Sequence, residues 1–261
     1  MRVASLVTTA MAACVLGMSA SAQTTWQVSA GTAAARTSTY DASASPLRYS
    51  GWAAPLHLEA TRHEPRSTTA AFASGASTVT GNARPLSNRA DREVVSRDEF
   101  EAGVSHLRVV SAGEDVRHEV GARLGLAGAT RTYDFQDGVS WDLVASLDGV
   151  YAVERSFPHQ RRLRVEGAVT LIGWVHRPPY FLASDDLFAA LYDGEGSFLG
   201  LGRVRVPDAL QKGTLALSYE HPLTARLSVL GTAGLRALRL TEPETTVTLT
   251  RSASVRLAVR L

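Results

Sequence analysis

Residues at the C-terminal end of the chain alternate between apolar and polar side chains. In the segment 246–261 the odd positions are mainly Val, Leu and Ala and the even positions mainly Thr, Ser and Arg. Successive side chains of a strand point to opposite faces, so this segment has one apolar and one polar face. It is longer than a usual strand of about five or six residues, and a tilted strand needs only about 9–11 residues to cross a bilayer. The pattern predicts a membrane-crossing strand.

Similar segments recur along the chain and predict ten strands in all. Their ranges are 25–36, 51–63, 67–80, 100–111, 116–132, 139–153, 161–176, 212–220, 225–240 and 245–261. The alternation is clearest in the C-terminal half. The segment 67–80 is mostly Ala, Ser and Thr and is assigned because the order of the joints requires a strand there.

The joints between these strands differ in length in a regular way. Long joints follow the first, third and seventh strands, at 37–50, 81–99 and 177–211, and tight joints follow even-numbered ones, at 64–66, 112–115 and 221–224. The joint at 133–138 is of medium length, and the last odd joint, 241–244, is the exception because it is short. A barrel with both termini in the periplasm has short periplasmic turns and longer extracellular loops. The sequence therefore predicts an all-β fold, an antiparallel transmembrane β-barrel of about ten strands.

The apolar faces are expected to point outward, toward lipid. They are rich in Ala, Gly, Val and Leu and poor in Phe, and aromatic side chains lie near the strand ends, as in an interfacial girdle. The expected girdle consists of Trp26, Tyr151 and Tyr219 near the periplasmic ends and Trp52 and Trp141 near the outer ends. A soluble periplasmic β-barrel that binds an apolar ligand is the alternative, and it would place the apolar faces inside.

The polar faces would then line a narrow lumen rich in arginine and carboxylate side chains. If the hairpins fold symmetrically about their turns, Arg123 faces Asp148 and Arg117 faces Glu154, which also faces Arg162. Opposite charges opposed across strands stabilise a sheet. The expected lumen charge network comprises Arg117, Arg123, Asp148, Glu154, Arg162, Arg164 and Glu166, and His57 and Glu59 are also expected to point inward.

The long joint 177–211 has a pattern of its own. Residues 184–193 predict a short helix with Ser184 as its N-cap, and 198–206 predict an extra strand or hairpin. If that hairpin joined the wall, the barrel would have twelve strands. We favour the other interpretation, a partly structured extracellular loop that folds over the barrel mouth.

The N-terminal segment predicts export. Arg2 is followed by an apolar stretch and by Ala20-Ser21-Ala22, which is typical of a cleaved secretory signal covering residues 1–22 and leaving a barrel domain at 23–261. Cys14, the only cysteine, follows two small residues and leaves a lipoprotein processing site as the alternative. Under the first interpretation the mature chain has no cysteine and no disulfide.

Composition excludes several classes of function. The chain carries 27 Lys plus Arg against 25 Asp plus Glu, and no basic block indicates nucleic-acid binding. After the signal no apolar run approaches the length of a helical membrane span. The histidines have no zinc-site spacing and no phosphate-binding glycine loop follows a strand, so no metal and no cofactor are expected.

One group of residues could carry chemistry. Ser140, Asp142 and His176 fall on the polar face near the outer rim, and a symmetric hairpin would place Ser140 opposite His176. Nucleophilic catalysis needs a hydroxyl within reach of a base that a third group orients. Asp142 shares a strand with Ser140 and is poorly placed to orient His176, so the sequence favours a solvated rim over a catalytic site.

The signal, the amphipathic strands with short inner turns and the terminal strand ending in Val259-Arg260-Leu261 resemble Gram-negative outer-membrane β-barrel proteins. The resemblance implies outer-membrane lipid and the barrel-assembly machinery as partners, the latter through the C-terminal strand. Such proteins typically end in an aromatic residue, and leucine stands here instead. No motif matches omptin proteases, outer-membrane phospholipases or lipid A deacylases.

The sequence therefore favours a non-enzymatic outer-membrane barrel. It would bind or pass small solutes through a narrow charged lumen, or bind a ligand through its long extracellular loops. An outer-membrane hydrolase with a site at the rim and the soluble ligand-binding barrel are the alternatives. The ligand, the conductance and the oligomeric state do not follow from the sequence.

Overall fold

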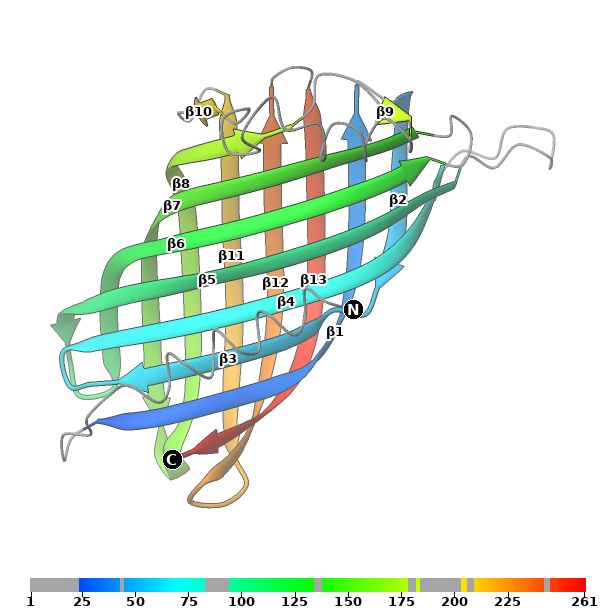
Figure 1. Ribbon diagram of the computed structural model, residues 1–261. Helices are drawn as coiled ribbons and strands as arrows, with labels where there is room; N and C mark the ends of the chain where they lie inside the picture. Colours follow the sequence, from blue (N-terminus) through cyan, green and yellow to red (C-terminus); the bar gives the residue numbers. More distant parts are fainter. Residues whose placement is uncertain are drawn as a thin grey trace.

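The computed structural model describes residues 24–42, 45–82, 94–133, 138–177, 182–183, 203–205, 209–241 and 245–261. Within these ranges the fold is all-β, with a single short 3-10 turn (Figure 1). None of the helices in the described ranges is long and apolar enough to cross a membrane.

All the strand pairings in the described ranges are antiparallel. The elements in chain order are β1 (Thr25–Asp41), β2 (Ser45–Ala53), β3 (Leu56–His63), β4 (Ser67–Asn82), β5 (Val94–Ala112), β6 (Val116–Tyr133), β7 (Gly138–Phe157), η1 (Pro158–Gln160), β8 (Arg161–His176), β9 (Leu182–Ala183), β10 (Arg203–Arg205), β11 (Leu210–Pro222), β12 (Leu227–Leu240) and β13 (Thr246–Arg260).

The sheet closes on itself because β1 pairs with β13. Both β2 and β3 pair with β1 on one side and with β4 on the other, so together they form one interrupted strand of the wall. The wall therefore has ten strands, as predicted. The short strands β9 and β10 pair only with the outer ends of β7 and β8 and add no further strand to the ring, so the twelve-stranded alternative is wrong.

The interruption between β2 and β3 lies at Pro55, which has no N–H to donate to the ladder. Its carbonyl still accepts a hydrogen bond from the Ala33 N–H at 2.9 Å, which holds the break against β1. The predicted long joint at 37–50 is wrong, because β1 continues to Asp41 and β2 begins at Ser45. The sequence signal is weak here because inward Thr37 and Thr39 bond to Thr250 and Thr248 instead of packing apolar side chains.

The apolar faces point outward and the polar faces inward. In β13 the outward Val255 and Leu257 are 62% and 56% exposed, whereas the inward Thr248 is 3% exposed. In β7 the inward Asp142 and Asp148 are buried and alternate with outward Trp141 and Tyr151. This orientation is the one predicted for a lipid-facing barrel and the opposite of that expected for a soluble ligand carrier.

A β-bulge interrupts the alternation of β8. Leu147 and Asp148 of β7 are consecutive but pair with Ile172 and Thr170, so Leu171 is an extra residue on β8. A bulge shifts every later side chain to the other face. Beyond it Val175 packs inside against Val144 and Leu210, whereas Trp174 lies outside. The predicted placement of His176 on the polar, inward face is therefore wrong.

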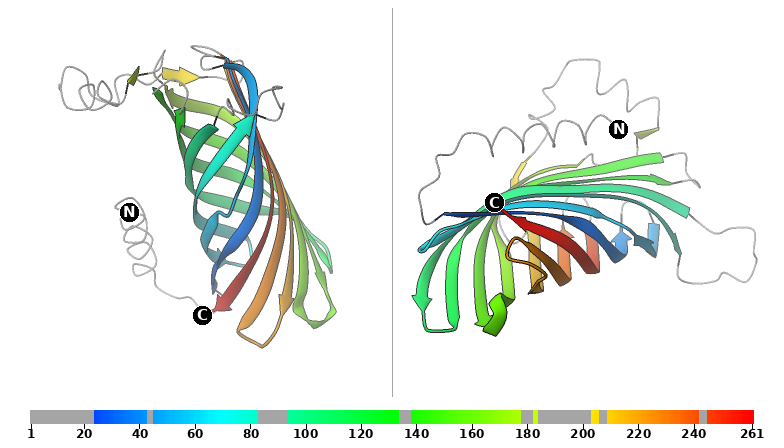
Figure 2. Two further views of the ribbon diagram at one scale, coloured as in Figure 1. Left: turned by 90° about the vertical axis from the view of Figure 1, so that its right-hand side faces the viewer. Right: turned by 90° about the horizontal axis from the view of Figure 1, so that it is seen from below.

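The barrel has two walls that cross at an angle. Strands β4 to β8 run obliquely across the front, and β11, β12, β13 and the outer part of β1 stand upright behind them (Figures 1 and 2). We call these the oblique wall and the upright wall. The short β9 and β10 lie at the outer end, opposite the C-terminus (Figure 1).

The described residues cover little of the joint 177–211, for which two elements were predicted. The predicted helix at 184–193 lies outside the described residues. Of the predicted extra strand at 198–206, residues 203–205 form β10, which is outside the ring.

Candidate functional site: the lumen

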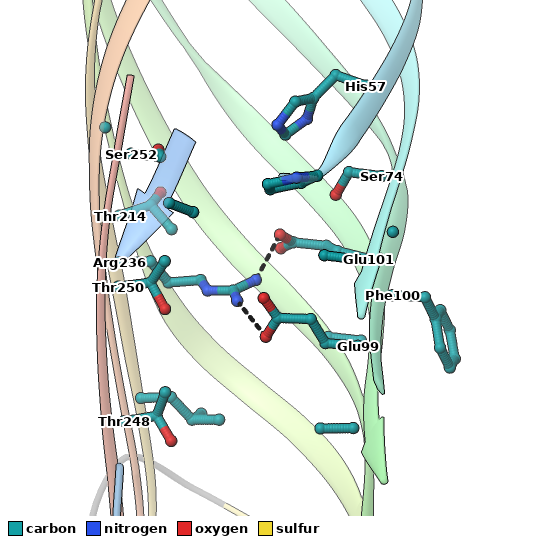
Figure 3. A pocket seen from close by; sticks show the side chains of 18 of the residues that line it. His57, Ser74, Glu99, Phe100, Glu101, Thr214, Arg236, Thr248, Thr250 and Ser252 are labelled. Carbon is teal, nitrogen blue, oxygen red and sulfur yellow. Dashed lines mark hydrogen bonds and ion pairs between the residues drawn. The ribbon is translucent and has the colours of Figure 1, made fainter. Parts of the chain in front are cut away.

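The outer half of the lumen contains a cavity of about 260 Å³. It lies between the oblique and upright walls, and charged side chains enter it from both sides (Figure 3). The charged residues that line it are Arg97, Glu99, Glu101, Arg131, Asp142, Lys212, Arg236 and Arg256. Its size is slightly below the range of about 300–1,000 Å³ typical of small-molecule pockets.

Arg236 crosses this cavity from one wall to the other. Its guanidinium donates to Glu101 at 2.8 Å and forms an ion pair with Glu99 at 3.4 Å (Figure 3). Arg236 is on β12 and the two glutamates are on β5, half a ring away. An ion pair between opposite sides of a barrel narrows the space through which a solute would pass.

Lys212, the only lysine of the chain, forms a second link across the lumen. Its ammonium lies 3.3 Å from Glu101 and 3.3 Å from Asp148. The lysine side chain is 5% exposed, and Ser146 supplies a third oxygen at 3.5 Å. Because a buried charge needs partners on several sides, these contacts fix the ammonium group in place.

A third group of charges lies at the outer mouth. Arg131 of β6 pairs with Asp142 of β7 and approaches Asp41 of β1 at 3.8 Å. Arg177, just after β8, lies 2.6 Å from Asp41 and 3.3 Å from Asp142. All four side chains are at most 4% exposed. They connect strands on opposite sides of the mouth.

Hydroxyl groups line the upright wall of the cavity. Thr214, Thr248, Thr250 and Ser252 project from β11 and β13 toward the charged side chains of the oblique wall (Figure 3). Hydroxyls can donate and accept hydrogen bonds. The cavity thus offers a neutral polar surface on one side and fixed charges on the other.

The inner half of the lumen is filled by charged side chains that pair with residues of the same or nearby strands instead of bridging the lumen. Glu119 is 1% exposed and accepts from Arg164 at 2.6 Å, from Arg117 at 2.7 Å and from Thr68 at 2.8 Å. Arg123 pairs with Glu166 and stacks over the Phe72 ring at 5.4 Å. These partners are two wall strands apart or nearer, in contrast to Arg236 and its glutamates.

The predicted charge network lies in the lumen, with partners that differ from those expected. The assumed register of β6 and β7 is the one observed, with Arg123 opposite Asp148 and Arg117 opposite Glu154. The ion-pair partners differ, however. Arg123 pairs with Glu166 of β8, and Arg117 pairs with Glu119 of its own strand.

The expected contact of Glu154 with Arg162 is replaced by one with Arg164. Glu154 stands opposite Arg164 at 3.8 Å, and Arg162 stands opposite Ser156. The turn at η1 is centred on His159, one residue later than in the symmetric hairpin assumed from the sequence, which shifts the register by two residues. Its His159 and Gln160 have positive φ angles of 63° and 59°, which allow the tight reversal.

The structure separates the three residues considered for catalysis. Ser140 and Asp142 point into the lumen, where Ser140 is opposite Arg131 of β6. His176 stands opposite Leu143, and the bulge turns it outward between the rings of Trp141 and Trp174, whose centroids lie 6.0 and 5.9 Å away. The expected pairing of Ser140 with His176 is wrong, and no catalytic triad is assembled from these residues.

The five predicted girdle residues all lie on the outward face. Trp52 is 67%, Tyr151 50% and Tyr219 41% exposed, and Tyr151 accepts or donates a hydrogen bond with exposed His118 at 2.8 Å. Trp26 and Trp141 are partly exposed on the same face. His57 and Glu59 both point inward; Glu59 pairs with Arg256.

Sequence reasoning missed the residues that bridge the lumen. Glu99 fell in a predicted loop, and Glu101, Arg131 and Arg236 were not linked because their partners lie far apart in the sequence. The available signal was that each occupies an inward position of an alternating strand. In the described ranges no group of three or more His, Cys, Asp or Glu side chains is arranged to hold a metal ion.

Comparison with known proteins supports the fold. No protein-family model matches the chain, and no curated protein sequence matches it either. Among solved structures, the outer membrane protease OmpT from Escherichia coli aligns with a TM-score of 0.50 and 9% identity, covering 94% of this chain and 99% of its own.

Two further solved structures show a looser likeness. The translocator domain of the autotransporter NalP from Neisseria meningitidis aligns with a TM-score of 0.47 and 12% identity, over 99% of this chain and 96% of its own. Ail, the attachment invasion locus protein of Yersinia pestis, aligns with a TM-score of 0.38 and 7% identity, over 92% and 99%. The alignment with OmpT, at 9% identity, concerns the fold alone, which is that of an outer-membrane β-barrel.

Proposed function

We propose that this protein is a non-enzymatic outer-membrane barrel that admits small polar solutes into a narrow, charge-bridged lumen. The observation that carries the proposal is the Arg236 bridge to Glu99 and Glu101 through the middle of the cavity. It leaves room for a small solute and obstructs a large one. The inward charges and outward apolar faces support the same assignment.

The outer membrane is the proposed location. The predicted signal at residues 1–22 would direct export, and the C-terminal strand β13 would be recognised by the barrel-assembly machinery. Lipid contacts would be made by the outward aliphatic side chains and the aromatic girdle. The separation of Ser140 from His176 gives the hydrolase alternative no support.

Conductance across planar bilayers tests the proposal. The wild-type protein should show a small conductance in KCl, and Arg236→Met should raise it several-fold, because removing the guanidinium opens the space between the walls. Arg108→Met is a matched control, since Arg108 is on β5, the strand of Glu99 and Glu101, but exposed on the outer face.

Two results would count against the proposal. An equal conductance for the wild type and Arg236→Met would show that the bridge does not limit passage. No conductance from either protein, in samples that retain the folded barrel on unboiled gels, would leave a purely structural role for the lumen charges.

A further inference from the structure

An uncompensated group of arginines occupies the outer face of the upright wall. Arg36 of β1 and Arg251 of β13 are directly opposite each other in the register and both side chains are exposed. Arg48 of β2 and Arg239 of β12 lie four residues nearer the outer ends of their wall strands and also point outward. We call Arg36, Arg48, Arg239 and Arg251 the outer arginine patch.

The centre of this patch is unfavourable without a counterion. Directly opposed residues on one face of an antiparallel pair have Cβ atoms about 4.5–5.5 Å apart, and like charges at that spacing destabilise the sheet. The lumen arginines Arg236 and Arg256 are each paired with a carboxylate, Arg236 with Glu101 and Arg256 with Glu59. By contrast, none of the four patch arginines has an ion pair with another described residue.

No acidic side chain of the wall can compensate the patch. The described outward positions of β11, β12, β13, β1 and β2 are aliphatic, aromatic, small, hydroxyl, amide, imidazole or arginine, and none is Asp or Glu. Within the described wall, Arg36 and Arg251 therefore have no acidic partner, and their outward side chains are open to a ligand on the side that faces lipid.

The depth of the patch indicates which part of the lipid it meets. Trp52 of β2 stands opposite Arg36 on its other side and is 67% exposed. Tryptophan is enriched at the membrane interface, where the headgroups begin. Below this level the outward residues of β13 are Ala253, Val255, Leu257 and Val259, which suit the hydrocarbon region. Arg36 and Arg251 thus lie at the height of lipid phosphates.

We infer that Arg36 and Arg251 bind the phosphate of a phosphorylated lipid in the outer leaflet, with Arg48 and Arg239 attracting further negative charge from its headgroup. Arginine presents several N–H donors in a planar fork that matches phosphate oxygens. A phosphate between the two guanidiniums would convert their repulsion into two charge-assisted contacts. The acyl chains would lie along the aliphatic surface of β13 and β1.

Native mass spectrometry of the purified barrel in detergent tests this site, with lipid A bearing two phosphates as the probe. The wild type should retain bound lipid A, and Arg36→Gln/Arg251→Gln should retain at least several-fold less. Arg108→Gln is a matched control, because Arg108 is exposed on β5 near the opposite end of the barrel. Phosphatidylcholine, whose phosphate is neutralised by its own choline, should bind weakly to all three proteins.

A second readout separates lipid binding from a structural effect. Without added lipid, Arg36→Gln should raise or leave unchanged the unfolding midpoint, since it removes a like-charge contact; with lipid A it should lose the stabilisation that the wild type gains. Equal retention of lipid A by the double variant and the wild type would overturn the inference. So would equal stabilisation of the wild type by inorganic phosphate, because the site would then recognise a free anion.

Discussion

The free-energy cost of leaving a charged residue of this barrel unpaired depends on the face of the sheet and on the height at which the residue lies. Arg131 and Asp142 are almost fully buried at the mouth, whereas Arg251 is exposed on the lipid side. Desolvation makes an unpaired buried charge far more costly than an exposed one. The consequences of substitution should therefore follow position more than residue type.

Arg131→Met should destabilise the folded barrel. The change leaves Asp142 with Arg177 alone at 3.3 Å and weakens the link to β1 at Asp41. Breaking a buried ion pair by removing one partner costs about 3–5 kcal/mol. The double variant Arg131→Met/Asp142→Leu should recover much of that loss, because it removes both charges. Urea unfolding followed by tryptophan fluorescence measures both, and equal midpoints for the single variant and wild type would contradict the assignment.

At the scale of elements, some glycines lie so close to the backbone of the neighbouring strand that no Cβ would fit there, whereas others have free space around them. At Gly121 of β6 an added Cβ would lie 2.0 Å from the carbonyl oxygen of His106 and 2.8 Å from the Leu107 Cα on β5. At Gly231 of β12 it would meet no atom within 4 Å. The same substitution should therefore have opposite outcomes at two strand positions.

Gly121→Ala should destabilise the barrel by about 1–3 kcal/mol or more, the usual cost of overpacking, because backbone atoms of β5 must move. Gly231→Ala should be neutral or slightly stabilising, since alanine loses less conformational entropy in a strand than glycine. The unfolding midpoints in urea, compared between the two variants, check the prediction. Equal losses in both would indicate that the separation of β5 and β6 is not set by Gly121.

The β-bulge in β8 also determines which side chains of that strand point into the lumen. One extra residue, Leu171, moves Trp174 and His176 outside and brings Val175 into the lumen beside Leu210 and Leu240. The apolar cluster formed there fills the space beside Val144. A single inserted residue thus determines which side chains of β8 face the lumen near the mouth of the barrel.

At the scale of the whole molecule, the sheet is closed and its outer surface is apolar. Closure satisfies all the backbone groups that an open edge would expose, which is the condition for a sheet to span a bilayer. The upright and oblique walls are joined through the lumen by Arg236 and Lys212. The barrel should therefore resist unfolding by detergent as a single unit.

Extraction of the protein should require detergent, and the unboiled protein should migrate faster on SDS gels than the boiled one, because the closed barrel stays compact. Treatment of membranes with salt or alkaline carbonate is the control for peripheral association. Release by salt together with equal mobility before and after boiling would contradict a membrane-spanning barrel.

The sequence by itself determined the strands, their number and the direction of their faces. Long alternation with a period of two, as in 246–261, is a local property that survives in any tertiary setting, and it predicted most of the wall strands, whereas the strand at 67–80 was predicted from the order of the joints. Where polar side chains occupy both faces, as near Thr37 and Ser38, the signal disappears and the predicted strand ended too early.

Only the tertiary structure decided which charges meet. The register of β6 and β7 followed from the assumption of a symmetric hairpin, but Arg123 pairs with Glu166 rather than the opposed Asp148, because side chains reach across the curved lumen. The bulge at Leu171 is set by the pairing of β8 with β7, and the contact of Arg236 with Glu101 depends on closure of the ring, which joins residues far apart in the chain. Local sequence patterns carry no information about which distant residues lie close together in space, so the charged lumen site can be described only from the closed barrel.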